Sequence, residues 1–127
     1  MKVLALDFGR ARTGVAVSDP TGTIARPLEV VLGADVARIL ELIDEHGVER
    51  VVVGLPLTLR GERGEQARET EAFIQTLADA TAIPVVPFDE RFTTDLAQQS
   101  GGAEADEDAR AAAHLLSGYL TWSSAKA

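Results

Sequence analysis

Three carboxylic acids stand where a predicted element ends or begins, which are common positions for side chains that do chemistry. Asp7 closes a nearly continuous apolar run, Glu90 follows a second apolar run at 83–88, and Asp108 lies near the start of the last predicted helix. Because the carboxyl ends of parallel strands open onto the crevice where ligands bind, we expect Asp7 and Glu90 to emerge at one edge of a sheet. Asp108 falls at the margin of the packed side of its helix, so its side chain could point over these strand ends.

Each acid also has a purely structural interpretation, since Asp7 can bond to turn amides, Glu90 can mark a strand's exit and Asp108 suits a helix N-terminus. Taken together, they form an oxygen-only ligand set in a chain without cysteine. Such a set suits Mg²⁺ or Mn²⁺. Two of these ions roughly 4 Å apart stabilise both the attacking and the leaving oxygen of a phosphoryl displacement. The acids therefore indicate phosphodiester hydrolysis.

Glycine and arginine residues surround the acids. Gly9 and Gly14 could let a phosphate or a metal-bound oxygen approach the backbone of the first loop closely. Arginine grips phosphate in a bidentate manner, although an ordinary arginine is a solvated surface residue. The arginines in or next to these loops, from which we expect contacts with nucleic acid, are Arg10, Arg12, Arg60, Arg63 and Arg91.

The charge balance and composition limit the class of protein. Twelve Lys and Arg against twenty Asp and Glu give a net charge of −8, which argues against a generic nucleic-acid binder. A local basic patch stays compatible with this balance, because most of the excess acid lies in the second half of the chain. No apolar run reaches the roughly 18 residues of a membrane span, and the start of the sequence has no cleavable signal pattern. We therefore expect a cytoplasmic protein that contacts no membrane.

The elements that position the acids follow from the hydrophobic periodicity. Apolar runs and one turn predict an antiparallel meander of three strands, and the later pattern predicts αβαβ and two further helices. The strands are expected at 2–8, 13–18, 23–31, 50–54 and 83–88, and the helices at 34–47, 65–80, from Thr93 or Thr94 to Gly101-Gly102, and at 106–122. This order predicts a single α/β domain over residues 1–127, with a five-stranded mixed sheet of three antiparallel and two parallel strands flanked by helices.

Four segments, in order along nearly the whole chain, resemble one known family. They are Asp7-Phe-Gly-Arg-Ala-Arg-Thr-Gly, Val53-Gly-Leu-Pro-Leu, Asp89-Glu-Arg-Phe-Thr-Thr and Asp108-Ala-Arg-Ala-Ala-Ala. They are similar to the YqgF/RuvX family, nucleases that resemble Holliday junction resolvases and have an RNase H-like fold. The resemblance implies that Asp7, Glu90 and Asp108 are catalytic acids that bind Mg²⁺ or Mn²⁺. It also implies a structured RNA or branched DNA substrate, with processing of precursor 16S ribosomal RNA as one role, and a monomer or homodimer.

Two departures from the family remove positive charge near the expected scissile phosphate. The first loop has Ala11-Arg12 where the family usually has Lys-Arg, and the segment before Asp108 is acidic where the family is often lysine-rich. We expect both to affect substrate affinity more than metal binding. Two alternatives stay open: a non-catalytic RNA- or protein-binding module with the same fold, and an ATPase of the actin-like or sugar-kinase type. The first loop resembles the phosphate loop of those ATPases, but they need two such domains around the nucleotide.

Overall fold

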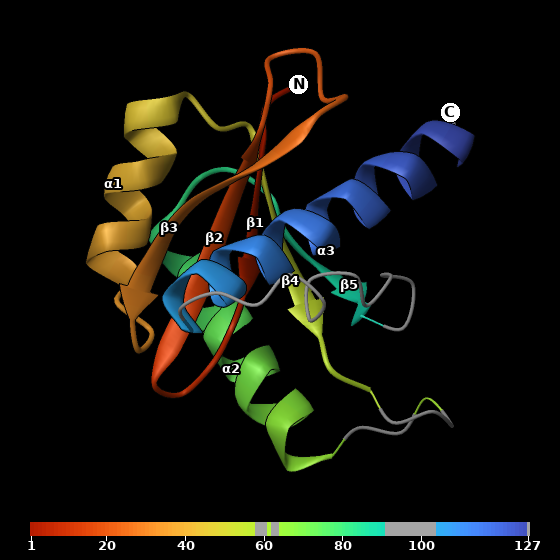
Figure 1. Cartoon of the computed structure of the whole chain (residues 1–127). Helices are drawn as coiled ribbons and strands as arrows, with labels where there is room; N and C mark the ends of the chain where they lie inside the picture. Colours follow the sequence, from red (N-terminus) through yellow and green to blue (C-terminus); the bar gives the residue numbers. More distant parts are fainter. Residues whose placement is uncertain (58–60, 62–63, 91–103, 127) are drawn as a thin grey trace.

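The computed structural model describes residues 1–57, 61, 64–90 and 104–126 (Figure 1). Within these residues strands and helices alternate after an initial run of strands. In chain order the elements are β1 (Val3–Asp7), β2 (Arg12–Ser18), β3 (Ala25–Leu32), α1 (Val36–His46), β4 (Arg50–Leu55), α2 (Glu65–Ala80), β5 (Val85–Asp89) and α3 (Glu104–Lys126). None of the helices in these segments combines the length and the apolar character that crossing a membrane requires.

The strands form one mixed sheet in the order β3-β2-β1-β4-β5. β2 pairs antiparallel with both β1 and β3, whereas β4 pairs parallel with both β1 and β5. The predicted sheet of three meander strands and two parallel strands is therefore confirmed. Because β1, β4 and β5 run in one direction, Asp7 and Asp89 end their strands at the same edge of the sheet.

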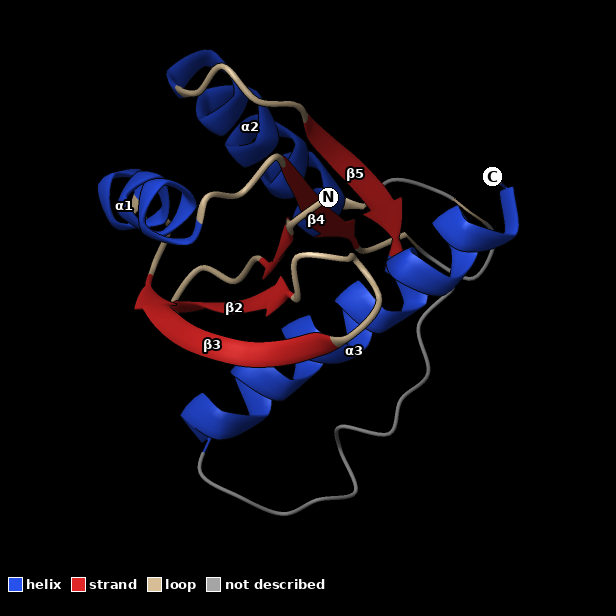
Figure 2. Ribbon diagram, turned by 90° about the horizontal axis from the view of Figure 1, so that it is seen from above, coloured by secondary structure: helices blue, strands red, loops and turns tan. Residues whose placement is uncertain are grey.

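Helices cover both faces of the sheet, with α1 and α2 on one side and α3 on the other (Figure 2). Alternate residues of β1 face opposite sides: Leu4 and Leu6 pack with α1 and α2, whereas Val3 and Ala5 pack with α3. This burial on both faces explains why β1 is apolar at successive positions rather than at every second one. The sequence pattern of β1 thus reflects its central place in the sheet.

The predicted and observed boundaries of the elements agree best where the sequence has a residue that ends a helix. α1 ends at His46 because Gly47 adopts the left-handed conformation with φ of 61°. α3 extends beyond the predicted 106–122 at both ends, since its polar terminal residues lie outside the apolar stripe on which the prediction rested. β5 begins at Val85, the first residue in register with β4, rather than at residue 83. The helix predicted after Thr93, and Arg60, Arg63 and Arg91, lie outside the described residues.

Candidate metal centre at the carboxyl edge of the sheet

Asp7 at the end of β1 and Glu90 just after β5 share a hydrogen bond between their carboxyl groups. β4 lies between these two strands, so the Glu90 side chain must cross it to reach Asp7. Gly54 of β4 makes the crossing possible: a Cβ at this position would lie 2.6 Å from Glu90 Oε1 and 3.0 Å from its Cγ. The close approach of the two acids thus depends on the absence of a side chain at residue 54.

The environment of this pair favours the protonated form. Burial raises the pKa of Asp7, and the charge of Asp108 raises it further, while the hydrogen bond from Glu90 acts in the opposite direction. Burial, the charge of Asp7 and the hydrogen bond to Asp7 raise the pKa of Glu90 to about 7. Two carboxylates at one partly buried position are therefore stable together only when they share a proton or a cation.

Asp108 reaches the same edge because α3 packs closely against β2. Gly14, the β2 partner of Asp7 in the sheet register, faces the first part of α3. A Cβ at Gly14 would lie only 1.9 Å from the backbone oxygen of Asp108. The space beside Gly14 is thus occupied by the helix backbone of α3, and this contact brings the third acid next to Asp7.

Arg12 holds the Asp108 carboxylate. Its Nε donates to Oδ2 of Asp108 at 2.7 Å, and about a third of each side chain is exposed. Arg12 opens β2 and Asp108 belongs to α3, so the pair also joins two elements that are distant in sequence. An arginine expected to contact phosphate is therefore paired with one of the three acids.

Arg10 and Gly9 belong to the tight connection between β1 and β2. Nε of Arg10 donates to Oε2 of Glu69 in α2 at 2.7 Å. A Cβ at Gly9 would lie 2.4 Å from the backbone oxygen of Arg12, so the loop itself fills the space beside Gly9.

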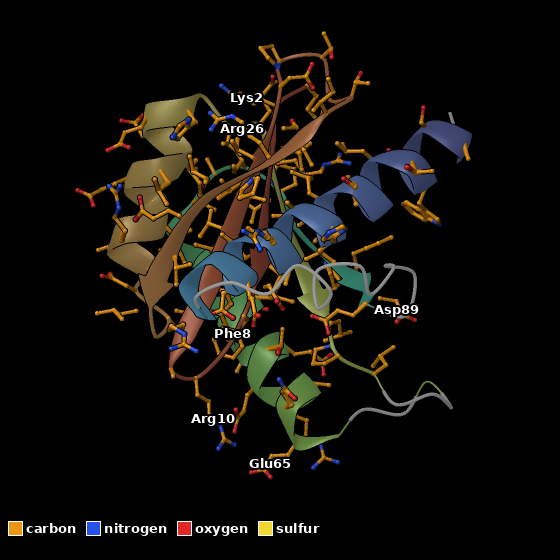
Figure 3. The ribbon with its side chains drawn as sticks, in the orientation of Figure 1. Lys2, Phe8, Arg10, Arg26, Glu65 and Asp89 are labelled. Carbon is orange, nitrogen blue, oxygen red and sulfur yellow. The ribbon has the colours of Figure 1, made fainter. Side chains whose placement is uncertain are left out.

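A pocket of about 500 Å³ lies at this loop, next to Glu65 and Glu69. Figure 3 shows Phe8, Arg10 and Glu65 at this end of the molecule, with Lys2 and Arg26 at the opposite end of the strands.

The donor set fits a hard divalent cation by its chemistry, since all three side chains are carboxylates. Among the described residues, no group of three or more His, Cys, Asp or Glu side chains is arranged to hold a metal ion as it stands. Glu90 bonds to Asp7, and Asp108 bonds to Arg12. A bound cation would therefore balance the negative charge of the three acids, which a shared proton and the Arg12 guanidinium balance without it.

Gly54 is the residue of this site that sequence reasoning did not single out for a role. Its signal is a glycine inside the strand sequence RVVVGL, where β-branched residues otherwise predominate. A glycine in a strand interior often marks a position where another group approaches the backbone closely. Glu69, the partner of Arg10, gave no comparable signal because it lies on the polar side of a predicted helix.

Glu90→Gln is expected to raise the melting temperature of the metal-free protein at about pH 8, by roughly 3–6 °C for a domain of this size. The Glu90 carboxyl of the unfolded chain loses its proton near 4.5, whereas that of the folded protein keeps it to about 7. The unfolding free energy of the parent protein therefore falls as the pH rises through this window. Glutamine keeps the shape and the donor to Asp7 but carries no charge. Thermal melts with a chelator from about pH 5 to about pH 8 measure the effect.

Asp44→Asn, an exposed substitution on α1, is the matched control for this experiment and should not change the pH dependence. At about pH 5 the difference between Glu90→Gln and the parent should be much smaller than at about pH 8, because the loss of stability has only begun just above the unfolded-state pKa of 4.5. A difference between the two proteins that is the same at both pH values would contradict the raised pKa of Glu90.

Comparisons with known proteins find a matching family, similar relatives and similar solved structures. A family described as "RuvX: Holliday junction resolvase" matches residues 1–122. A protein of Rubrobacter xylanophilus named "Putative pre-16S rRNA nuclease" is 45% identical over 127 residues, which cover 94% of this chain and 91% of that protein. A Chloroflexus aurantiacus protein of the same name is 50% identical over 101 residues, 76% of this chain and 66% of its own length.

Among solved structures, "T. thermophilus RuvC in complex with Holliday junction substrate" superimposes with a TM-score of 0.63 and 20% identity. The match covers 97% of this chain and 96% of that one. The five-stranded sheet with its three described helices therefore has a RuvC-like RNase H fold, as expected from the sequence.

Proposed function

The chain belongs to the RuvX family, and from this premise we propose that it hydrolyses phosphodiester bonds of nucleic acid with two divalent metal ions. One observation carries the proposal: three carboxylic acids from distant parts of the chain converge at the carboxyl edge of the sheet. Two of them form a hydrogen-bonded pair that resists losing its last proton. Such a pair does not stabilise the fold without metal, which supports a role of these acids in binding cations.

The three acids would divide the ligand roles according to their places in the fold. Asp7 lies in the central strand, accepts a hydrogen bond from Glu90 and lies close enough to Asp108 for the charge of Asp108 to raise its pKa. We therefore assign Asp7 to both ions. Glu90 and Asp108 would complete one ion each. Bound Mg²⁺ or Mn²⁺ would supply a lowered pKa for the attacking water and stabilisation of the leaving oxygen. Arg12 orients the Asp108 carboxylate through its hydrogen bond, and Gly54 gives the Glu90 side chain its path to Asp7.

We propose precursor 16S ribosomal RNA as the substrate, on the strength of the relatives' names and the length over which they match. The chain spans about two thirds of the Chloroflexus protein but most of the Rubrobacter protein. Under this proposal it acts as one domain in the bacterial cytoplasm, as a monomer or a homodimer.

The test is an endonuclease assay with the purified protein on RNA that carries the 5′ end of 16S ribosomal RNA and its upstream segment. Cleavage is expected with Mg²⁺ or Mn²⁺ and should stop when a chelator in excess is added. A four-way DNA junction and a fully paired RNA duplex serve as comparison substrates. Preferential cleavage of the junction would contradict the RNA assignment, and no cleavage of any substrate with either ion would favour a binding module with this fold.

A further inference from the structure

We propose that a pocket between β5 and the carboxyl half of α3 binds one unpaired nucleobase of the substrate. The pocket has a volume of about 340 Å³ and is lined by Phe88, Tyr119 and Trp122 together with Arg50 and Asp89. We call it the aromatic pocket. The inference rests on the proposed nuclease function and adds the substrate class: a strand that is single-stranded beside the scissile bond.

The three aromatic rings of the pocket pack against one another, and the ring of Trp122 is the exposed one of the three. The ring of Phe88 lies edge-on to that of Tyr119, with centroids 5.5 Å apart, and 5.6 Å from the ring of Trp122. Phe88 and Tyr119 are buried, whereas Trp122 is 40% exposed. Tightly packed neighbours therefore hold an indole ring at the surface in a defined orientation, as stacking of a flat base requires.

Hydrogen-bonding groups stand beside these rings. Nη1 of Arg50 donates to the Tyr119 hydroxyl at 2.9 Å, which fixes the guanidinium at the pocket wall. Nε of Arg50 is buried and has no hydrogen-bond partner among the described residues. Asp89 also lines the pocket. Stacking surfaces with polar groups close by are the means by which proteins recognise unpaired bases.

The aromatic pocket adjoins the proposed metal centre. Asp89 lines the pocket and immediately precedes Glu90, and Figure 3 shows Asp89 at the carboxyl end of β5. Side chains alternate along a strand, so Phe88 and Glu90 point to the same side of the sheet about 7 Å apart. The exposed Trp122 ring lies a further 5.6 Å from the buried Phe88 ring, so we infer that it contacts a base a short way along the strand from the phosphodiester bound at the three acids.

Charge explains why stacking is needed for binding. The chain has a net charge of −8, and two of the arginines expected to contact phosphate are paired with protein carboxylates, Arg10 with Glu69 and Arg12 with Asp108. Phosphate neutralisation normally supplies most of the affinity for nucleic acid, and here it is weakened. Stacking on aromatic rings contributes affinity without added positive charge.

The size of the aromatic pocket argues against a second copy of the chain as the occupant. A stable protein interface buries about 800 Å² on each partner, far more than a pocket of this size offers. A nucleobase that enters the pocket cannot remain paired in a duplex, so the occupant belongs to a single-stranded segment.

Trp122 is the only tryptophan in the chain, so its fluorescence reports directly on the aromatic pocket. The protein, in a chelator to prevent cleavage, is titrated with a single-stranded RNA of about eight nucleotides and with a blunt RNA duplex of the same composition. We expect quenching by the single strand and little by the duplex. In anisotropy titrations with labelled single strand, Trp122→Ala should raise the Kd about tenfold, and Trp122→Phe should restore most of the affinity.

Leu32→Ala serves as the control variant, because Leu32 is 79% exposed at the end of β3, far from the aromatic pocket in the sheet order. Its Kd should equal that of the parent. The salt dependence of binding should have the same slope in Trp122→Ala and the parent, since no phosphate contact is lost.

Equal Kd values for Trp122→Ala and the parent, or equal quenching by single strand and duplex, would overturn the inference. A dimer in sedimentation experiments that Trp122→Ala converts to monomer would assign the pocket to a second copy and overturn it as well. Because binding is measured without metal, single-strand binding through Trp122 in a protein that cleaves nothing would contradict the proposed function and support the pocket assignment.

Discussion

Gly14→Ala is expected to lower the free energy of unfolding by about 3 kcal/mol or more and to reduce nuclease activity sharply. The new methyl group would lie 1.9 Å from the backbone oxygen of Asp108 and 2.5 Å from its carbonyl carbon. Both atoms belong to a helix backbone, so no side-chain rotation can relieve the clash and α3 must move away from β2. Asp108 would move with α3. Chemical denaturation gives the stability change, and the cleavage assay gives the loss of activity.

Gly64→Ala is the matched control for this substitution. Gly64 precedes α2 with φ of −83°, and no atom of the described residues lies within 4 Å of a Cβ built there. Its stability should change by less than about 1 kcal/mol. If Gly14→Ala proved as stable and active as Gly64→Ala, the close contact between α3 and β2 that places Asp108 would be contradicted.

Much of the fold could be predicted from local patterns. The apolar run that ends at Asp7 is continuous because β1 is buried on both faces, and the period of the later segments changes to that of helices where α1 and α2 form. The meeting of Asp7 and Glu90 also follows from a general rule, because parallel strands expose their carboxyl ends at one edge.

The partners within the site could not be predicted, because they depend on contacts between distant segments. Arg12 and Asp108 are 96 residues apart, and Arg10 and Glu69 are 59 apart. No periodicity or spacing encodes these pairs. Gly14 is a further example. From the sequence we expect a ligand to approach the backbone at Gly14, whereas in the structure the backbone of α3 occupies the space beside this residue. Packing of the last helix across the sheet, which decides where Asp108 lies, has no local signature.

Asp7→Asn is expected to reduce the rate of metal-dependent cleavage on the order of 10³-fold, while the melting temperature does not fall. Asparagine has nearly the same volume as aspartate but lacks the charge that we assign to both ions. Metal ions contribute several kcal/mol of charge stabilisation in the transition state, and about 1.4 kcal/mol corresponds to tenfold in rate. The fold should tolerate the change, because burial already raises the pKa of Asp7 and thus opposes its charged form.

The most direct test of the account is the ratio of initial cleavage rates of the parent and Asp7→Asn on the precursor ribosomal RNA substrate in Mn²⁺. Both proteins are purified in parallel, with Asp44→Asn as the control for removal of an exposed acid. The account predicts that parent and Asp44→Asn cleave at equal rates and that Asp7→Asn is reduced to the background seen with chelator. Cleavage by Asp7→Asn at the parent rate would contradict the assignment of the three acids as the metal centre.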